Sequence, residues 1–332
     1  MKKIVLIVIP LIYTILVSLC GCIEERSIPK IFPVEKYLEA KMIPFDYIID
    51  RANVMIVNDC IVFESNKVDT LIHIYSLPEI DHILSFGTKG QGPNEFLLLD
   101  IVNNNSDLLC LSGYVNTDLI KCFRIDENNK TVINTKEYHL KGISVHKIIN
   151  PVIINDSILF YFEHSAAMHI VSYDLKKEKI ISQKKIKVNE KHNKIWQRYN
   201  NGFIKVNSQT VAFAYLYQDK ISFMNHNFSG INTVKKDAKT SIEEVVQNSI
   251  IYYLNGYAGK DKFYYLYLGC SLKELDNGEK QNSIEVFDNK GNPLVKYNLN
   301  VPIYRFAVDE KNYMMYAYGE NDDVLLVFNL NE

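Results

Sequence analysis

The sequence has few of the features that catalysis, metal binding or nucleic acid binding require. It contains no Gly-x-Ser-x-Gly motif and no CxxC pair, and its 8 histidines are scattered along the chain. Its 37 basic and 39 acidic residues give a formal net charge of −2, without the clustered basic surface that nucleic acid binding needs. We therefore predict no catalytic residues, no metal, no cofactor and no nucleic acid partner.

Regularly alternating helices are also missing, which argues against a parallel α/β sheet. Short segments rich in β-branched and aromatic residues follow one another instead, for example residues 54–57, 60–63 and 71–75. Turn-forming residues separate these segments. One stretch, residues 241–250, has helical periodicity with Ser241 as its N-cap. The sequence predicts an all-β fold with one short helix, inserted between the fourth and fifth of the repeated units described next.

The strand segments form groups that recur at a spacing of about 45 residues, which is typical of four-stranded propeller blades. The sixth group lacks its fourth strand, which residues 31–43 could supply. Closing the ring with strands from both ends would remove exposed strand edges. We predict a six-bladed β-propeller of four-stranded antiparallel blades over residues 31–332. The six units are residues 53–86, 107–140, 152–188, 203–234, 251–299 and 304–330.

The first residues have the pattern of a secretory signal peptide. Lys2 and Lys3 precede an apolar run over residues 4–19 that carries no charge. The run is shorter than the roughly 20 residues of a membrane-spanning helix, and Pro10 interrupts it. An uncleaved anchor helix is the alternative interpretation.

The residues that follow this run, Leu19-Cys20-Gly21-Cys22, resemble the bacterial lipobox. Cleavage would follow Gly21, and Cys22 would be the lipid acceptor, because a small residue precedes the acceptor in that motif. Acyl chains on Cys22 would hold the protein at a membrane. We predict a lipoprotein signal peptide at residues 1–21 and a tether at residues 22–30.

Four further cysteines, Cys60, Cys110, Cys122 and Cys270, lack the spacing of a zinc site. Cys110 and Cys122 flank a predicted turn and could face each other across one hairpin. A disulfide between them is compatible with an oxidising compartment. Two free buried thiols are the alternative, which we favour from the sequence.

A glycine-rich turn contains Gly87, Gly90, Gly92 and Pro93. Glycines can approach a phosphate closely, but a phosphate site of this kind needs a following helix. Residues 97–102 instead have the composition of the first strand of the next blade. We therefore predict a structural turn in which the glycines adopt positive φ angles.

The whole stretch, residues 86–96, resembles the glycine-rich turn of the TolB-like six-bladed β-propeller lipoproteins. Residues 266–269 and the stretch from residue 284 to 318 are also similar to that family. Its members are mostly uncharacterised lipoproteins of Gram-negative gut anaerobes. The resemblance implies a lipid-anchored location in the cell envelope, at the outer membrane, and it implies no catalytic residue. Glu24 and Glu25 are similar to a surface-targeting signal, although a solvated tether explains them equally.

Tyrosine dominates the aromatic residues, with 22 copies against a single Trp. Tyr suits glycan and protein surfaces, but strand packing also enriches it. We name Trp196 and Tyr257 as candidate ligand contacts and assign most other tyrosines to packing.

These features favour a non-enzymatic, membrane-anchored lipoprotein that binds a glycan or an envelope protein through a propeller face. A metal-dependent hydrolase of sugars or lactones, with its site at the propeller axis, is the alternative. Asp59, Asp156 and Asp309 are acidic candidates for such a site, although each lies at a predicted turn whose chemistry explains it.

Overall fold

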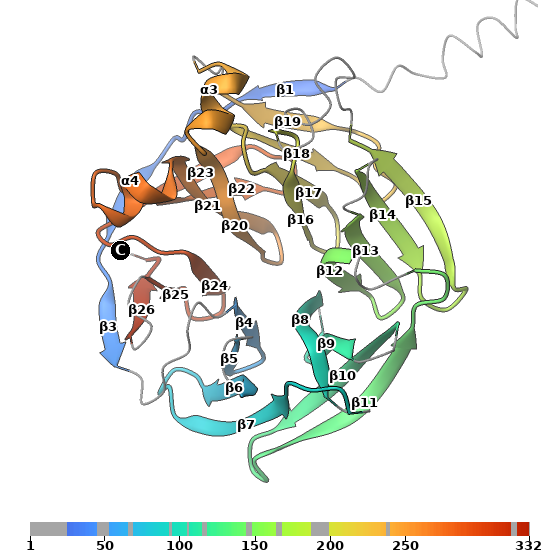
Figure 1. Cartoon of the computed structure of the whole chain (residues 1–332). Helices are drawn as coiled ribbons and strands as arrows, with labels where there is room; N and C mark the ends of the chain where they lie inside the picture. The colour runs from blue at the N-terminus through green and yellow to red at the C-terminus, as the bar shows by residue number, and fades with distance from the viewer. Residues whose placement is uncertain are drawn as a thin grey trace, which may run out of the picture.

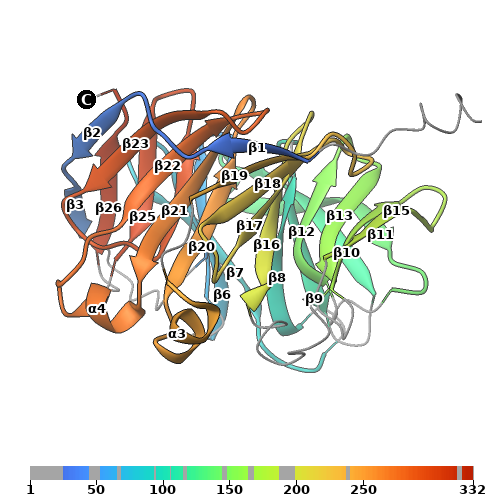
Figure 2. The ribbon, with the colours of Figure 1, turned by 90° about the horizontal axis from the view of Figure 1, so that it is seen from above.

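The computed structural model describes residues 25–44, 53–65, 69–92, 95–104, 106–114, 118–143, 148–163, 168–186, 199–236, 240–319 and 324–331. Its strands form six blades arranged in a ring around a central axis (Figure 1). Turned by 90°, the same ring shows α3 and α4 together on one of its two faces (Figure 2). The predicted six-bladed β-propeller is confirmed.

The first strand of each blade lies nearest the axis, and later strands lie progressively further out (Figure 1). Blade I contains β4 (Asn53–Val57), β5 (Cys60–Glu64), β6 (Thr70–Ser76) and β7 (His82–Thr88). Blade II contains β8 (Phe96–Asn104), β9 (Leu109–Tyr114), β10 (Leu119–Asp126) and β11 (Thr131–His139). Blade III contains β12 (Ile148–Ile154), β13 (Ile158–Glu163), β14 (His169–Asp174) and β15 (Lys179–Lys185). Blades II and III share one eight-stranded sheet, because β8 and β12 also pair in parallel.

Blades IV and V follow the same plan, and blade VI takes three strands from the C-terminal part of the chain. Blade IV contains β16 (Gly202–Val206), β17 (Val211–Tyr215), β18 (Lys220–Met224) and β19 (Asn232–Lys235). Blade V contains β20 (Ile251–Ala258), β21 (Lys262–Cys270), β22 (Ser283–Asp288) and β23 (Pro293–Leu299). Blade VI takes β24 (Arg305–Asp309), β25 (Met314–Tyr318) and β26 (Val324–Asn329).

Residues 25–44 form a strap along the outer edge of blades IV, V and VI (Figure 1). In the strap, β3 (Lys41–Pro44) pairs antiparallel with β26 and supplies the missing fourth strand of blade VI, as predicted for residues 31–43. Two further strands, β1 (Arg26–Pro29) and β2 (Glu35–Leu38), pair in parallel with β19 and β23. These two were not predicted, and they make blades IV and V five-stranded rather than four-stranded.

The strap also corrects the predicted tether at residues 22–30. Its last residues are part of the propeller, because β1 is hydrogen-bonded to blade IV. Glu25 is held there as well: its Oε1 accepts a hydrogen bond from the Thr233 hydroxyl at 2.6 Å, and Lys220 Nζ lies 3.9 Å from the same oxygen. The propeller therefore begins no later than Glu25, and not at residue 31.

The predicted signal peptide and Cys22 lie outside the described residues. Cleavage after Gly21 and lipid on Cys22 therefore stay predictions. Within the described ranges, no helix is long and apolar enough to cross a membrane.

The hydrophobic core consists of six clusters, and each lies between two adjacent blades of the ring. Alternate residues of β21 illustrate the arrangement. Phe263 and Tyr265 pack toward blade IV, whereas Tyr264 and Leu266 pack toward blade VI. Both faces of each blade are thus buried, which explains why the strands are apolar almost throughout. Five tyrosines are among the largest fully buried side chains: Tyr173, Tyr253, Tyr265, Tyr316 and Tyr318.

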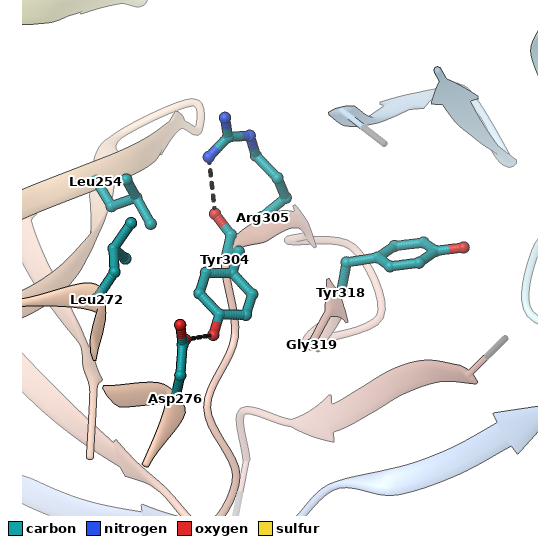
Figure 3. A pocket seen from close by; sticks show the side chains of 7 residues that line it. All are labelled: Leu254, Leu272, Asp276, Tyr304, Arg305, Tyr318 and Gly319. Carbon is teal, nitrogen blue, oxygen red and sulfur yellow. Dashed lines mark hydrogen bonds between the residues drawn. The ribbon is translucent and has the colours of Figure 1, made fainter. Parts of the chain in front are cut away.

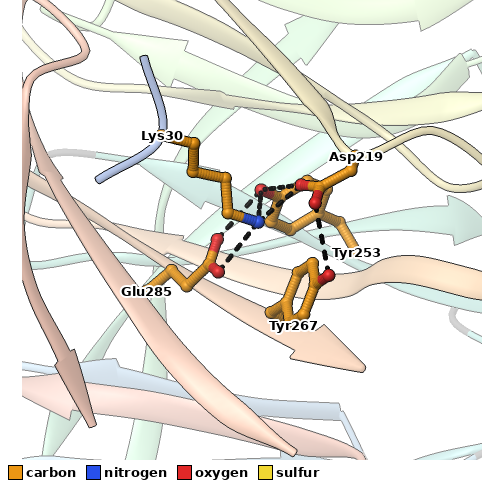
Figure 4. A network of polar contacts seen from close by, with 5 residues as sticks. All are labelled: Lys30, Asp219, Tyr253, Tyr267 and Glu285. Carbon is orange, nitrogen blue, oxygen red and sulfur yellow. Dashed lines mark hydrogen bonds and ion pairs between the residues drawn. The ribbon is translucent and has the colours of Figure 1, made fainter. Parts of the chain in front are cut away.

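A buried ion cluster fixes the strap between blades IV and V (Figure 4). Lys30 Nζ lies 2.5 Å from Asp219 Oδ1 and 2.8 Å from Glu285 Oε1. It also donates to the Tyr253 hydroxyl at 3.0 Å and lies 3.7 Å from the centre of the Tyr267 ring. The Lys30 side chain is 6% exposed, and those of the two acids are 4% and 1% exposed. A lysine as buried as Lys30 is poorly hydrated, so its positive charge depends on both carboxylates for stabilisation.

Two short helices lie on one face of the ring (Figure 2). The predicted helix is α3 (Ile242–Gln247), and Ser241 Oγ accepts from the Glu244 amide at 3.2 Å, as its N-cap role requires. A second helix, α4 (Leu272–Asp276), was not predicted. Its signal is present in the sequence, since Ser271 and Glu274 form a reciprocal capping box.

Cys110 and Cys122 are joined by a disulfide across β9 and β10, where their Cα atoms lie 4.0 Å apart. The expectation of free thiols is therefore wrong for this pair. The directly opposed positions on adjacent strands bring the two side chains together. Cys60 and Cys270 are free and buried.

Replacing Lys30 by Met should destabilise the propeller, because Asp219 and Glu285 would stay buried without their cation. Removing one partner of a buried ion pair costs about 3–5 kcal/mol of unfolding free energy. Lys41→Met, at an exposed position of the same strap, is the matched control and should change stability by less than about 0.5 kcal/mol. Urea denaturation of the full chain measures both values. Equal losses for the two variants would contradict a special role of Lys30.

The loss in Lys30→Met should also depend on pH. Burial raises the pKa of Glu285, and Lys30 opposes that shift. Without Lys30, folded Glu285 keeps its proton to a higher pH than the unfolded chain does, so stability falls as pH rises above the ordinary Glu pKa of 4.5. We expect a smaller loss at pH 5 than at pH 8, and adding Glu285→Gln should reduce the difference. A loss that does not vary with pH would argue against this assignment.

Candidate functional site

The innermost strands of the six blades surround the propeller axis (Figure 1). A cavity of about 80 Å³, which we call the channel cavity, is lined by residues from every blade. Of the innermost strands, β4, β16, β20 and β24 are sheet edges, while β8 and β12 pair with each other. Polar side chains on these strands can face the cavity without disrupting the cores between blades. Those that line the cavity are Asn53 of β4, Asp100 and Asn103 of β8, Asn150 of β12, Lys205 of β16 and Asn255 of β20.

Two residues of opposite charge line this cavity, Asp100 from blade II and Lys205 from blade IV. Burial raises the pKa of Asp100 to about 6, and Lys205 opposes that shift. Burial lowers the pKa of Lys205 to about 8; Arg305 adds to this effect, and Asp100 opposes it. At neutral pH the channel therefore holds a poorly solvated ammonium group and a carboxylate close to its titration range.

A third charged residue, Arg305, is the first residue of β24 in blade VI. Its Nε donates to Asn53 Oδ1 at 3.1 Å, and Asn53 Nδ2 donates to Glu64 Oε2 at 2.7 Å. Burial lowers the pKa of Arg305, and the nearby Glu64 carboxylate opposes the shift. Asn53 thus links a cation of blade VI to an anion of blade I.

A larger pocket of about 260 Å³ lies between blades V and VI (Figure 3). The Tyr304 hydroxyl donates to the Asp276 carboxylate of α4, and Arg305 Nη1 donates to the Tyr304 carbonyl at 3.0 Å. Leu254 and Leu272 supply apolar surface beside these polar groups (Figure 3). The remaining lining residues are Tyr318 and Gly319.

Neighbouring residues of β20 and β24 line the pocket and the channel cavity. On β20, Leu254 lines the pocket and the next residue, Asn255, lines the channel. On β24, Arg305 lines the pocket and reaches Asn53 of the channel with its guanidinium group. A ligand in the pocket can therefore touch residues that border the channel. We call the pocket and the adjoining cavity the channel site.

The channel site is suited to binding a polar ligand through hydrogen bonds and charge. Asparagine side chains can both donate and accept, and cationic side chains attract anions. Among the described residues, no group of three His, Cys, Asp or Glu side chains is arranged to hold a metal ion. The two cations near the axis would also repel a divalent metal ion.

One of the two predicted ligand contacts lies at this site. Tyr257 lines the channel cavity from β20. Burial raises its pKa, with Glu310 and Asp309 adding to the shift, so its hydroxyl stays neutral. Trp196 lies outside the described residues. The sequence-based prediction missed Asp100, Lys205 and Arg305, although a charged residue within or at the start of an apolar first strand is a visible signal.

The glycine-rich turn leads into a strand, as predicted, but of its glycines only Gly87 has the predicted positive φ angle. Gly87 has a φ of 81°, whereas Gly90 and Gly92 are not in the left-handed region. They instead make room for Glu95, whose Oε2 accepts from the Gly92 amide at 2.6 Å. The next strand, β8, begins at Phe96 as expected, and Pro93 lies outside the described residues.

The acidic candidates for an axial metal site occupy turns at the ends of innermost strands. Asp59 Oδ1 accepts from Lys311 Nζ at 2.9 Å, and Lys136 Nζ lies 3.4 Å from Asp156 Oδ2. Asp309 Oδ1 accepts backbone hydrogen bonds within its own turn, at 3.0 and 3.1 Å. The three residues belong to blades I, III and VI, and none of them lines the channel cavity. Turn formation and neighbouring lysines account for each.

Comparisons with known proteins agree with this architecture. A family model described as a TolB-like six-bladed propeller matches residues 36–311. A Bacteroides fragilis protein provisionally assigned as exported has a similar fold, with a TM-score of 0.56, 14% identity, and coverage of 91% of this chain and 98% of that one. A DUF4221-family protein from Bacteroides vulgatus gives a TM-score of 0.55, 12% identity, and coverage of 88% and 97%. No curated protein matches the sequence.

Replacing Gly90 by Ala should destabilise the turn, because the new Cβ would lie 2.0 Å from Glu95 Oε2. Moving this flexible carboxylate breaks its hydrogen bond to the Gly92 amide, which should cost roughly 1–3 kcal/mol of unfolding free energy. Glu95→Ala removes the same hydrogen bond, so the double variant should lose little more than Gly90→Ala alone, which urea denaturation of the variants can measure. Inorganic phosphate should leave the melting temperature unchanged. A rise with phosphate would contradict a purely structural turn.

Proposed function

The chain belongs to the TolB-like six-bladed propeller family, and we propose that it is an exported, lipid-anchored and non-enzymatic binding protein. Its partner is a glycan or an envelope protein, which it binds at the channel site. The observation that carries this proposal is the contact between pocket and channel, where Arg305 of the pocket donates a hydrogen bond to Asn53 of the channel cavity in blade I.

The composition of the channel site supports binding more than catalysis. Hydrolysis by a propeller lactonase would need a metal ion held at the axis by several carboxylates or amides. The described cavity lining supplies one carboxylate, Asp100, beside amides from four blades, but the ammonium group of Lys205 lines the same cavity and would oppose a divalent cation. A rigid ring that presents donors and acceptors from several blades favours recognition of a partner with hydroxyl, amide or charged groups.

Export is supported by three independent features. The first residues have the pattern of a lipoprotein signal peptide. The Cys110–Cys122 disulfide is of a kind that persists in oxidising compartments outside the cytoplasm. A structural neighbour is itself provisionally assigned as exported. We place the protein in the cell envelope, anchored by lipid to the outer membrane.

The strap gives this anchor a short reach. Two residues separate Cys22 from Glu25, which is already held by Thr233 and Lys220 of blade IV. The three Cα-to-Cα steps from Cys22 to Glu25 span at most about 10–11 Å. A lipid on Cys22 would therefore hold the edge of blade IV close to the membrane surface, without a long flexible linker between the lipid and the propeller.

Cys22→Ala should abolish lipid attachment, whereas Cys20→Ala should leave it unchanged. The reason is that Gly21 is the small residue that precedes the acceptor in the lipobox pattern. Metabolic labelling with an alkyne fatty acid, followed by fractionation of cells, measures incorporation and membrane association of each variant. Labelling of Cys22→Ala at the level of the unchanged protein would refute the anchor.

Binding is tested with the full chain purified in detergent, on a glycan array and by photo-crosslinking in intact cells. We expect binding to a reproducible glycan class, or a crosslinked envelope protein. Arg305→Gln should lower the affinity for that partner at least about tenfold, since hydrogen bonds to charged groups contribute about 1.5–3 kcal/mol. Lys311→Gln, in a turn outside the channel site, is the matched control. The absence of both a glycan and a partner would refute the proposal, and tightly bound metal by elemental analysis would favour the hydrolase instead.

A further inference from the structure

Lys205 occupies the channel cavity without a contact partner of opposite charge. Its Nζ makes no hydrogen bond or ion pair with any residue in the described ranges, although it lines a cavity that also contains Asp100. The two neighbours on its strand, Ile204 and Val206, are buried in the apolar core between blades III and IV. A lysine in such a place loses much of its hydration, and that loss is normally compensated by a close anion.

The surrounding charges do not compensate it. Glu64 is engaged with Asn53, which links it to Arg305. Arg305 adds a second positive field at Lys205, and burial leaves Asp100 easier to protonate than an ordinary Asp. An anionic group placed between Lys205 and Arg305 would be stabilised by both cations.

The rest of the lining is neutral and able to hydrogen-bond in both directions. Asn103 and Asn150 line the cavity, and their side chains make no hydrogen bond within the described part of the chain. Asn255 lines the same cavity, and its Oδ1 already accepts from the Gly256 amide at 2.8 Å. The amides of Asn103 and Asn150 suit the hydroxyl groups of a sugar, each of which both donates and accepts.

The sizes of the two cavities indicate which part of a ligand each of them can hold. The channel cavity of about 80 Å³ admits a small group such as a carboxylate, while the adjoining pocket of about 260 Å³ has room for a ring. The pocket combines the apolar surface of Leu254 and Leu272 with the Tyr304–Asp276 hydrogen bond, which suits a sugar ring with one apolar face.

Building on the proposed function, we propose that the channel site binds an acidic sugar, such as a uronic acid residue of a glycan. Its carboxylate lies between Lys205 and Arg305, and its ring occupies the pocket beside Tyr304 and α4. Neutral amides around the channel select for hydroxyl-bearing ligands, and the two cations select for the acid.

The test measures binding to the full chain in detergent by isothermal titration calorimetry. The probes are galacturonic acid, glucuronic acid and their short oligomers, with the methyl ester of galacturonic acid as the uncharged match. We expect the acids to bind at least about tenfold more tightly than the ester, since a hydrogen bond to a charged group contributes about 1.5–3 kcal/mol of binding free energy. Equal binding of acid and ester would overturn the proposal.

Variants separate a direct role from a loss of folding. Lys205→Met should weaken binding of the acid by at least about tenfold, while Lys205→Arg, which keeps the charge, should retain it. Asp100→Asn removes a competing negative charge and should strengthen binding about threefold to tenfold, a gain that a damaged fold does not produce. Lys262→Met, at an exposed position of β21, is the matched control. Weaker binding with Asp100→Asn would overturn the proposal.

A pH series gives an independent readout. Asp100 and Tyr257 line the cavity with Lys205, Arg305 acts on Lys205 through its charge, and Glu64 acts in turn on Arg305. Protonation of Asp100, whose pKa is about 6, should tighten binding of the acid as pH falls from 7.5 to 5.5. Deprotonation of Lys205, whose pKa is about 8, should weaken it above that value. An affinity that rises between pH 7.5 and 9 would count against the assignment.

The proposal and the proposed function can fail separately. Binding of a neutral glycan or of an envelope protein, unaffected by Lys205→Met, would overturn the acidic-sugar assignment and leave the binding function in place. Binding of a glutamate-rich peptide without any sugar acid would overturn the sugar assignment in the same way. If no glycan, peptide or crosslinked protein is found, both fail together.

Discussion

The pairing of β3 with β26 is the contact on which the rest of the structure depends. A blade buries its two faces only if it has a neighbour on each side, so a ring with a gap would leave two faces in water. Blade VI closes that gap, and its fourth strand comes from the opposite end of the chain. The strap that carries β3 also covers the outer edges of blades IV and V, and Lys30 pins it there through two buried carboxylates. Closure therefore combines backbone pairing at the rim with one buried charge cluster.

Closure of the ring also creates the channel site. Asp100, Lys205 and Arg305 are about one hundred residues apart in sequence from one to the next, and they meet because each lies on an innermost strand of a different blade. In such a narrow channel the three charges share little water, which is why burial shifts the pKa values of all three. A site of this kind is rigid, since each residue is carried by a strand packed between two cores. Rigidity favours recognition of a small polar group over a moving catalytic arrangement.

The strap links the proposed anchor to the scaffold. Glu25 and β1 bind blade IV only a few residues after Cys22, and Lys30 follows directly. A protein held in this way stands close to its membrane with a restricted orientation. The same strap leaves Ile31 and Tyr37 largely exposed, at 75% and 81%, on the outer rim. Loss of the Lys30 cluster would act on both stability and anchoring geometry, because the strap carries both.

The sequence by itself determined the class of fold, the six repeated units, the completion of blade VI by N-terminal residues and the capped helix α3. These features are local or periodic: strand composition, a repeat of about 45 residues and an N-cap can be recognised without knowing what lies nearby. It did not reveal β1 and β2, because short edge strands with polar residues have no apolar pattern, nor the short helix α4. The tertiary structure alone decided which charges meet. Lys30 contacts Asp219 and Glu285, and Lys205 lines a cavity with Asp100, because the ring brings together strands that are distant in the sequence. Burial then makes these charges interact strongly.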